Sequence, residues 1–193
     1  MIGNDIVDLN LASVESNWQR KGFLDKLFTE VEQDLILNTN DPFKMVWLLW
    51  SMKESAYKVH VQQFNKRFFA PQKFQCTLIS DTSGVVKIVD NQYNTESIIT
   101  HNYIVTTTTS NGDGLVLVDN FKLINSSSRS QQKKCYTNLK RAISKEMNFS
   151  IDEISIKKNN VGVPKIFYKE KEQQISFSIS HHGHYGGYAI LNN

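Results

Sequence analysis

The sequence has few cysteines, few prolines and no long run of apolar residues. Its two cysteines, Cys76 and Cys135, cannot build a disulfide framework or a four-cysteine metal site. No apolar stretch approaches the roughly 18 to 20 residues that a membrane-spanning helix needs. The first ten residues contain Asp5 and Asp8 and no basic lead-in, unlike a secretory signal. We therefore expect a cytoplasmic protein with reduced thiols and no membrane partner.

The chain also lacks a strong charge imbalance. Its 193 residues carry a formal net charge of +3, with 40% apolar and 21% charged residues, as is typical of a globular domain. Residues 1–60 hold six basic and nine acidic side chains, whereas residues 61–193 hold sixteen and ten. The mildly basic second part is compatible with phosphates or an acidic partner. Because the sequence shows neither stacking aromatics of an RNA-binding sheet nor a helix-turn-helix pattern, we expect no nucleic-acid partner.

Two helix starts are well marked in the first third of the chain. Thr29 begins a capping box, T-E-V-E, with Glu32 three positions later. Asp41 can cap a helix, and Pro42 follows where a first-turn proline is tolerated. Apolar residues then recur at helical spacing, which predicts a long buried helix over residues 42–62. Further helices are predicted over residues 13–28 and 131–148.

Residues with high strand propensity dominate much of the remaining chain. Strands are predicted over residues 2–9, 74–80, 85–90, 97–108, 115–123, 151–157, 163–168, 175–181 and 185–191. Turn residues at 81–84 and 111–114 separate strands of the middle group, which indicates an antiparallel meander. The order of helices and strands predicts an α+β fold.

The first candidate site lies in the strand that begins the chain, which reads G-N-D-I-V-D from Gly3. Asp5 is a carboxylate in an otherwise apolar strand, and its burial is costly unless a cation or a donor faces it. Gly3 permits close approach of backbone or ligand. Taken alone, the motif favours an ordinary Asp in a turn at a strand end.

The second candidate site lies on the long helix, where residues 50–58 read W-S-M-K-E-S-A-Y-K. Trp50, Glu54 and Lys58 are four residues apart and share one helix face. Glu54 is thus expected at the core boundary, where it could hold a metal, and Lys58 could reach a phosphate bound to that metal. The alternative is an ordinary surface pair of Glu54 and Lys58, worth only about 0.3 to 0.5 kcal/mol.

The third candidate site is the late strand over residues 175–181, which reads I-S-F-S-I-S-H. Alternation places the serines on one face and the apolar residues on the other. The serines are Ser176, Ser178 and Ser180. Ser180 and His181, at the end of this strand, could hold a phosphate. The neighbouring His182 and His184 lack the further cysteine or histidine that a zinc site needs.

Together these stretches resemble the 4′-phosphopantetheinyl transferase superfamily, with its G-x-D, helical W-x-x-K-E-[AS]-x-x-K and late S-x-S-H signatures. The F-T-x-x-E at residues 28–32 and the G-x-P at residues 162–164 agree with the same family. The motif order is similar to the compact holo-acyl-carrier-protein synthase subgroup. The resemblance implies one domain over residues 1–193, with an antiparallel sheet packed on the long helix. The chain exceeds the compact type by a β-rich insertion at about residues 65–125. Asn4 departs from the family, which usually has Ile or Val there.

The resemblance implies an enzyme that transfers the 4′-phosphopantetheine arm of coenzyme A to a serine of an apo acyl or peptidyl carrier protein. The reaction depends on Mg²⁺ and releases 3′,5′-ADP. Asp5 and Glu54 match the metal-binding acids, and Lys58 matches the position that contacts the pyrophosphate. Ser180 and His181 match the region that holds the 3′-phosphate end of the cofactor. Glu54 and Lys58 are the catalytic candidates; either of them, or a metal-oriented water, could accept the serine proton.

The implied partner is an acidic helical carrier protein of fatty-acid, polyketide or peptide-synthetase type. Basic residues are candidate docking charges: Arg20, Lys21, Lys26, Lys133, Lys134, Lys140 and Arg141. A homotrimer is one expected assembly, because compact relatives build the site between subunits of a trimer. The alternative function is an inactive relative that binds coenzyme A or the carrier protein. The intact Asp5, Glu54 and Lys58 argue against that alternative.

Overall fold

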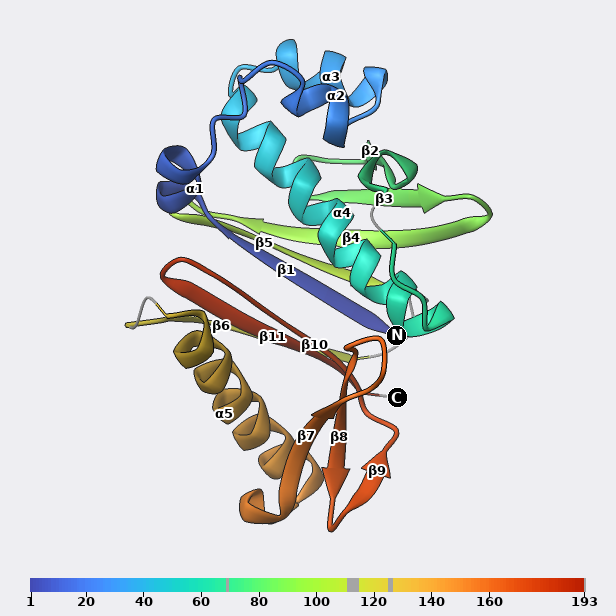
Figure 1. Ribbon diagram of the computed structural model, residues 1–193, viewed down its shortest axis with the longest axis vertical. Coiled ribbons are helices and arrows are strands. Elements are labelled where there is room, and N and C mark those ends of the chain that lie inside the picture. The colour runs from blue at the N-terminus through green and yellow to red at the C-terminus, as the bar shows by residue number, and fades with distance from the viewer. Residues whose placement is uncertain (69, 111–114, 125–126, 193) are drawn as a thin grey trace.

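The protein consists of two layered halves, one above the other in Figure 1. The structure, a computed structural model, describes residues 1–68, 70–110, 115–124 and 127–192. The upper half in Figure 1 holds four helices and a five-stranded sheet, and the lower half holds one long helix and two three-stranded sheets. Among the described residues, no helix combines the length and the apolar character that a membrane crossing requires.

The long helix α4 (Pro42–Phe64) forms the centre of the upper half. Its start agrees with the sequence, because the Asp41 side chain accepts a hydrogen bond from the Lys44 backbone N–H at 3.0 Å. The shorter helix α3 (Glu30–Leu37) has the complete predicted capping box at Thr29. Both of these helix starts are therefore confirmed.

The predicted helix over residues 13–28 is wrong. The chain instead forms α1 (Leu9–Glu15), a turn, and α2 (Phe23–Leu27). Gly22 interrupts the helix, since it adopts a left-handed conformation with φ of +78°. As a consequence Lys26 lies on α2, whereas Arg20 and Lys21 lie in the turn.

An antiparallel sheet packs on α4, as predicted, in the order β1-β5-β4-β3-β2. Its strands are β1 (Ile2–Asp8), β2 (Gln75–Leu78), β3 (Ser83–Ile88), β4 (Asn91–Ile99) and β5 (Tyr103–Thr109), and η1 (Pro71–Lys73) precedes β2. The single strand predicted over residues 97–108 is wrong. The chain reverses at Thr100, whose hydroxyl accepts the backbone N–H groups of Asn102 and Tyr103. The predicted turn at 111–114 lies outside the described residues.

The lower half completes the α+β architecture. One sheet has the order β10-β11-β6 and the other β7-β8-β9. The strands are β6 (Leu115–Lys122), β7 (Ile154–Lys158), β8 (Pro164–Tyr168), β9 (Lys171–Gln173), β10 (Ser176–His182) and β11 (Tyr185–Asn192). Helix α5 (Ser128–Met147) packs on them through a core that includes Leu139, Phe177 and Tyr188, and the short η2 (Ile151–Glu153) follows it. The predicted meander therefore ends at β5, because β6 crosses over to pair with β11.

The two halves are joined along β1 and β10 by serine side chains. One edge of β1 pairs with β5, and the other edge faces β10. Along that edge the hydroxyl of Ser176 accepts the Ile2 N–H at 3.1 Å, and the hydroxyl of Ser178 accepts the Asn4 N–H at 3.0 Å. These side-chain acceptors satisfy buried backbone donors that a neighbouring strand would otherwise satisfy. We call this contact the serine seam.

Candidate active site

Asp5 and Lys58 form an ion pair between β1 and α4. The Lys58 Nζ lies 3.1 Å from the Asp5 Oδ1 and donates a second hydrogen bond to the Asn4 carbonyl at 2.7 Å. The Lys58 side chain is 29% exposed and the Asp5 side chain 14%, so the pair opens to the surface. Lys58 therefore pairs with a carboxylate on another element, β1. The alternative from the sequence was an ordinary surface pair with Glu54 on the same helix.

Close approach of β1 to α4 brings these groups together. A Cβ atom added at Gly3 would lie 2.1 Å from the Ser55 carbonyl oxygen, a distance that no side chain tolerates. Gly3 therefore lets the strand lie directly against the helix, as its place in the motif predicted. Asp5 follows two positions later on the same face of β1, the face that meets the turns of α4 carrying Ser55 and Lys58.

The charge of Asp5 opposes the ionisation of Glu54. Burial raises the pKa of Glu54 to about 7, and the negative charge of Asp5 contributes to this increase. Burial also raises the pKa of Asp5, although the ammonium of Lys58 acts in the opposite direction. Two neighbouring carboxyl groups with raised pKa values favour a bound cation, because a cation stabilises both ionised forms.

This donor set fits a magnesium-type ion. Magnesium is usually bound by one or two carboxylates, with water and substrate phosphate in the other positions. Asp5 and Glu54 supply two carboxylates from two different elements, β1 and α4. Over the described ranges, no group of three or more His, Cys, Asp or Glu side chains gathers into a closed metal cage. The residues present are thus suited to an ion that shares its coordination with a substrate.

A cleft of about 320 Å³ adjoins Lys58 at the junction of the two halves. Three predicted residues line it: Lys58, Ser180 and His181. Two cations that the sequence reading missed, Arg67 and Lys158, line it as well. We call it the basic cleft, defined by Lys58, Arg67, Lys158 and His181. Burial lowers the pKa of His181, and the positive charge of Lys58 contributes.

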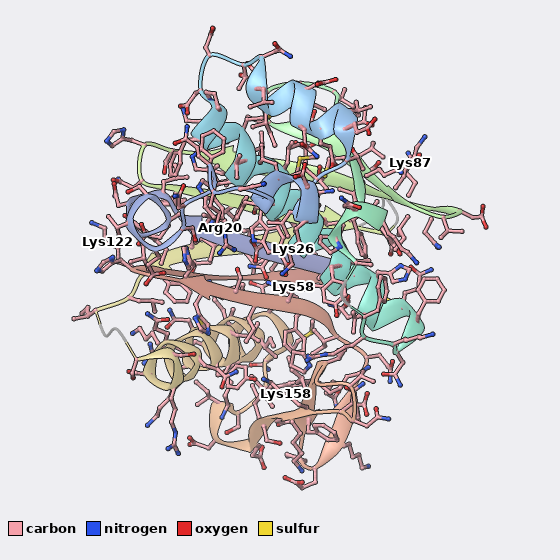
Figure 2. All side chains as sticks on the ribbon, turned by 45° about the horizontal axis from the view of Figure 1, so that its top comes forward. Arg20, Lys26, Lys58, Lys87, Lys122 and Lys158 are labelled. Atoms are coloured by element: carbon pink, nitrogen blue, oxygen red, sulfur yellow. The ribbon has the colours of Figure 1, made fainter. Side chains whose placement is uncertain are left out.

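Arg67 and Lys158 come from segments outside the family motifs. Arg67 follows the end of α4, and Lys158 ends β7 (Figure 2 labels Lys58 and Lys158). The Arg67 guanidinium lies against Gly162, where an added Cβ would be 2.5 Å from its Nη2 atom. The G-x-P turn at residues 162–164 was the only hint in the sequence that this region belongs to the site. The sequence does not show which cationic side chains contact that turn.

The serine hydroxyls of β10 serve both the seam and the cleft. Ser178 and Ser180 line the basic cleft, yet they are only 3% and 6% exposed. The Ser180 Oγ accepts a hydrogen bond from the Asn4 Nδ2 at 2.9 Å. Asn4 is itself fully buried, on the opposite face of β1 from Asp5.

A second cavity, of about 500 Å³, is lined by Glu54. Aromatic side chains dominate its wall: Trp50, Tyr57, Phe68 and Phe74. Tyr57 and Arg67 also line the basic cleft, so the two cavities are neighbours. The apolar wall is one physical reason that the ionised form of Glu54 is disfavoured.

Two motif residues have a structural role instead. Lys53, from the helical motif, lies 2.8 Å from Glu32, from the F-T-x-x-E motif, and both side chains are 2% exposed. Lys53 also donates to the carbonyls of Pro71 and Phe74. Glu32 accepts the backbone N–H of Cys76 at 2.7 Å. This buried pair ties α3, α4 and the start of the sheet together.

Comparisons with known proteins agree with these motifs. The family model of the 4′-phosphopantetheinyl transferase superfamily (ACPS) matches residues 1–109, more than half of the chain. Among solved structures, the chain is similar to holo-[acyl-carrier-protein] synthase (AcpS) of Thermotoga maritima, with a TM-score of 0.44 and 13% sequence identity, over 69% of this chain and 73% of that one. No curated protein matches the chain significantly. The matched residues carry Asp5, Glu54 and Lys58, and the chain belongs to the 4′-phosphopantetheinyl transferase superfamily.

Proposed function

We propose that this protein transfers the 4′-phosphopantetheine arm of coenzyme A to a serine hydroxyl of an apo acyl or peptidyl carrier protein. One observation supports this most directly. Asp5 on β1 forms an ion pair with Lys58 on α4, Glu54 lies one helical turn before Lys58, and Lys58 itself lines a cleft with basic walls. Phosphoryl transfer depends mainly on positioning and on neutralising phosphate charge, which is what this set of groups supplies.

In this proposal the basic cleft binds the nucleotide end of coenzyme A. Arg67, Lys158 and His181 present positive charge or hydrogen-bond donors from three separate segments. The diphosphate then lies near Lys58, next to the two acids. Asp5 and Glu54 would hold Mg²⁺, which supplies neutralisation of the diphosphate charge when bound.

The reaction requires one proton acceptor. The serine oxygen attacks the β-phosphorus, and the bond from that phosphorus to the bridging oxygen breaks. 3′,5′-ADP leaves, and the phosphopantetheine becomes esterified to the carrier serine. We assign the serine proton to Glu54, because this carboxylate lies one helical turn before Lys58, close to where the phosphate would be bound. Lys58 stabilises the charge that develops on the phosphate oxygens.

The carrier protein is expected to approach with an acidic surface, as its serine must reach the mouth of the cleft. Arg20 and Lys21 lie in the turn before α2 and Lys26 lies on α2 (Figure 2 labels Arg20 and Lys26). The other candidate docking charges lie on α5: Lys133, Lys134, Lys140 and Arg141. A carrier used in fatty acid biosynthesis is one expected partner, alongside polyketide and peptide-synthetase carriers.

A single assay tests the proposed function. The protein is incubated with coenzyme A, Mg²⁺ and an apo carrier protein, and the carrier mass is measured. The expected result is a mass gain of one phosphopantetheine arm, together with release of 3′,5′-ADP. Binding of coenzyme A without any mass gain, across several carriers, would instead support the inactive binding module.

Substitution of the two acids tests the site. Asp5→Ala and Glu54→Ala are each expected to lower the transfer rate by about a thousand-fold or more, because each removes a metal ligand in a partly dehydrated site. The fold should persist, since neither carboxylate supports a helix cap or a core contact. Mass spectrometry measures transfer and circular dichroism measures folding.

Asp90→Ala is the matched control, because it removes an exposed carboxylate from the β3–β4 turn. It is expected to transfer at the normal rate. An active Glu54→Ala protein would contradict both roles assigned to Glu54.

A further inference from the structure

Asn4 is hydrogen-bonded to three residues of the basic cleft, on α4 and β10, without lining the cleft itself. Its backbone N–H donates to Ser178, its carbonyl accepts from Lys58 at 2.7 Å, and its side-chain Nδ2 donates to Ser180 at 2.9 Å. All three partners line the cleft, whereas Asn4 is fully buried behind them. Two of these bonds use the backbone and are open to any residue. Only the bond to Ser180 depends on the asparagine side chain.

An amide at this position is costly for the fold. Ile2 and Ile6, on the same face of β1, are buried aliphatic residues that pack against the lower half. The Oδ1 atom of Asn4 is buried and finds no hydrogen-bond partner within the described part of the chain. Because an unsatisfied buried polar atom destabilises a protein, an aliphatic side chain would suit the fold better. Stability therefore does not explain the asparagine.

The bond from Asn4 determines how Ser180 can act. The Ser180 oxygen accepts a hydrogen bond from the Asn4 amide, so its own hydroxyl proton must be donated elsewhere. No acceptor for that proton is found among the residues that the structure describes. The hydroxyl lines a cleft that also holds Lys58, Arg67, Lys158 and His181, which attract anions. An oxygen of an anionic ligand is the acceptor that this arrangement favours.

The geometry points to Asn4 as a positioning residue that orients the Ser180 hydroxyl as a hydrogen-bond donor to a phosphate group of the nucleotide. This inference rests on the proposed function, since it takes the nucleotide end of coenzyme A to be the ligand of the basic cleft. It also explains why a polar residue interrupts the apolar face of β1. Asn4 acts through Ser180 and does not itself touch the ligand.

The test measures binding of 3′,5′-ADP, without metal or carrier, by isothermal titration calorimetry. Asn4→Leu replaces the amide with an apolar group of similar shape. It is expected to weaken binding about ten-fold, as is typical for loss of a hydrogen bond to a charged group. Ser180→Ala should weaken binding by a similar factor. The double variant should bind no more than about two-fold more weakly than either single variant, because both remove one interaction.

Thermal unfolding separates this role from a structural one. Asn4→Leu should unfold at the same temperature as the original protein or at a higher one, since it removes an unsatisfied buried amide. Ser176→Ala is the matched control: Ser176 accepts a β1 N–H in the same seam but lies outside the basic cleft, so its loss should leave 3′,5′-ADP binding unchanged. Asn4→Val is a second replacement with the same expected results.

Three outcomes would overturn the inference: normal binding by Asn4→Leu, losses that multiply in the double variant, or Asn4 variants that fail to fold. The transfer assay distinguishes these from failure of the proposed function. If the original protein neither transfers the arm nor binds 3′,5′-ADP, the proposed function fails and this inference fails with it. If the original protein does both and Asn4→Leu binds normally, only the role of Asn4 is wrong.

Discussion

The carboxyl group of Glu54 has a pKa close to neutral pH. Burial against the aromatic cavity and the charge of Asp5 raise its pKa to about 7. Since the folded pKa lies above the usual value, the folded state binds the Glu54 proton more tightly than the unfolded chain does. The stabilising effect of that proton is present at low pH and is lost as pH rises toward 7. In the metal-free protein, Glu54 thus lowers stability at neutral pH.

Magnesium binding is therefore expected to depend on pH. A cation at Asp5 and Glu54 requires ionised carboxylates, so affinity should increase from about pH 5 to about pH 7 and then level off. Binding near pH 6 should release a proton, which calorimetry in two buffers of different ionisation enthalpy detects. Glu54→Gln should bind magnesium weakly at every pH and release fewer protons on binding than the original protein. Equal proton release by both proteins would contradict the role of Glu54.

His181 is expected to affect binding more than chemistry. His181→Ala should raise the KM for coenzyme A about five- to ten-fold and change kcat by less than about two-fold, because the side chain lines the cleft, which neither acid lines. Burial and the charge of Lys58 lower its pKa, so it acts at neutral pH mainly as a neutral hydrogen-bonding group. Steady-state kinetics with varied coenzyme A measures this. A large fall in kcat with unchanged KM would place His181 at the reacting phosphorus instead.

At the scale of elements, the contact between β1 and α4 builds the site. Gly3 allows the strand to meet the Ser55 carbonyl, and the Ser55 hydroxyl in turn lies 2.6 Å from the Thr108 hydroxyl on β5. The helix is thereby held against two strands. The position of Asp5 relative to Lys58 depends on this contact.

Gly3→Ala should therefore damage stability and activity together. The new methyl group must displace either β1 or α4, at a cost of about 1 to 3 kcal/mol or more, as for other overpacked cores. Transfer should fall as well, because Asp5 moves with the strand. Denaturant unfolding and the mass assay provide the two measurements.

Gly22→Ala is the control for this prediction, because an added Cβ there meets nothing within 4 Å. It should cost only about 1 to 2 kcal/mol, owing to the left-handed backbone, and leave transfer unchanged. Normal activity in Gly3→Ala would show that the β1–α4 distance does not set the site.

At the scale of the whole molecule, the basic cleft draws on both halves. Lys58 and Arg67 belong to α4 and the segment after it, whereas Lys158 and His181 belong to β7 and β10 in the lower half. The serine seam joins the halves behind the cleft. A ligand in the cleft therefore contacts both halves at once.

Coenzyme A is expected to stabilise the two halves as one unit. At a concentration about a hundred times its Kd, a ligand that binds only the folded state adds about 2.7 kcal/mol, which raises the Tm by about 5 to 10 °C for a chain of this size. Hydrogen exchange should slow both in α4 and in the β7–β8 hairpin. Protection limited to one half would contradict a cleft shared between the halves. Pantetheine, which lacks the nucleotide, is the control and should have little effect.

Local sequence patterns determined much of this protein. The capping box at Thr29 and the Asp41-Pro42 start depend only on residues within one helical turn, and both helices begin there. The alternation of serine and apolar residues in β10 likewise predicts which side chains lie on the same face of that strand. The motif residues Asp5, Glu54 and Lys58 were recognisable because family membership preserves their type and spacing. The proposed roles of the site residues remain predictions.

The sequence-based predictions of helices and strands were wrong where a local backbone preference competes with contacts to residues distant in the chain. The helix over residues 13–28 failed at Gly22, and the strand over 97–108 divides at a turn that Thr100 stabilises. β6 has the composition of a meander strand, yet it pairs with β11 from the other end of the chain. The β-rich insertion at about 65–125 remains a prediction; β2 to β5 extend the sheet that contains β1, and the family match runs to residue 109.

The sequence by itself determined the helix starts, the strand alternation and the identity of the motif residues, because each depends on groups close together in the chain. Only the tertiary structure decided that Lys58 pairs with Asp5, that Arg67 and Lys158 enter the cleft, and that Asn4 reaches Ser180. These contacts join residues far apart in the chain. Their distances follow from how the sheets and helices pack, and no local pattern encodes that packing.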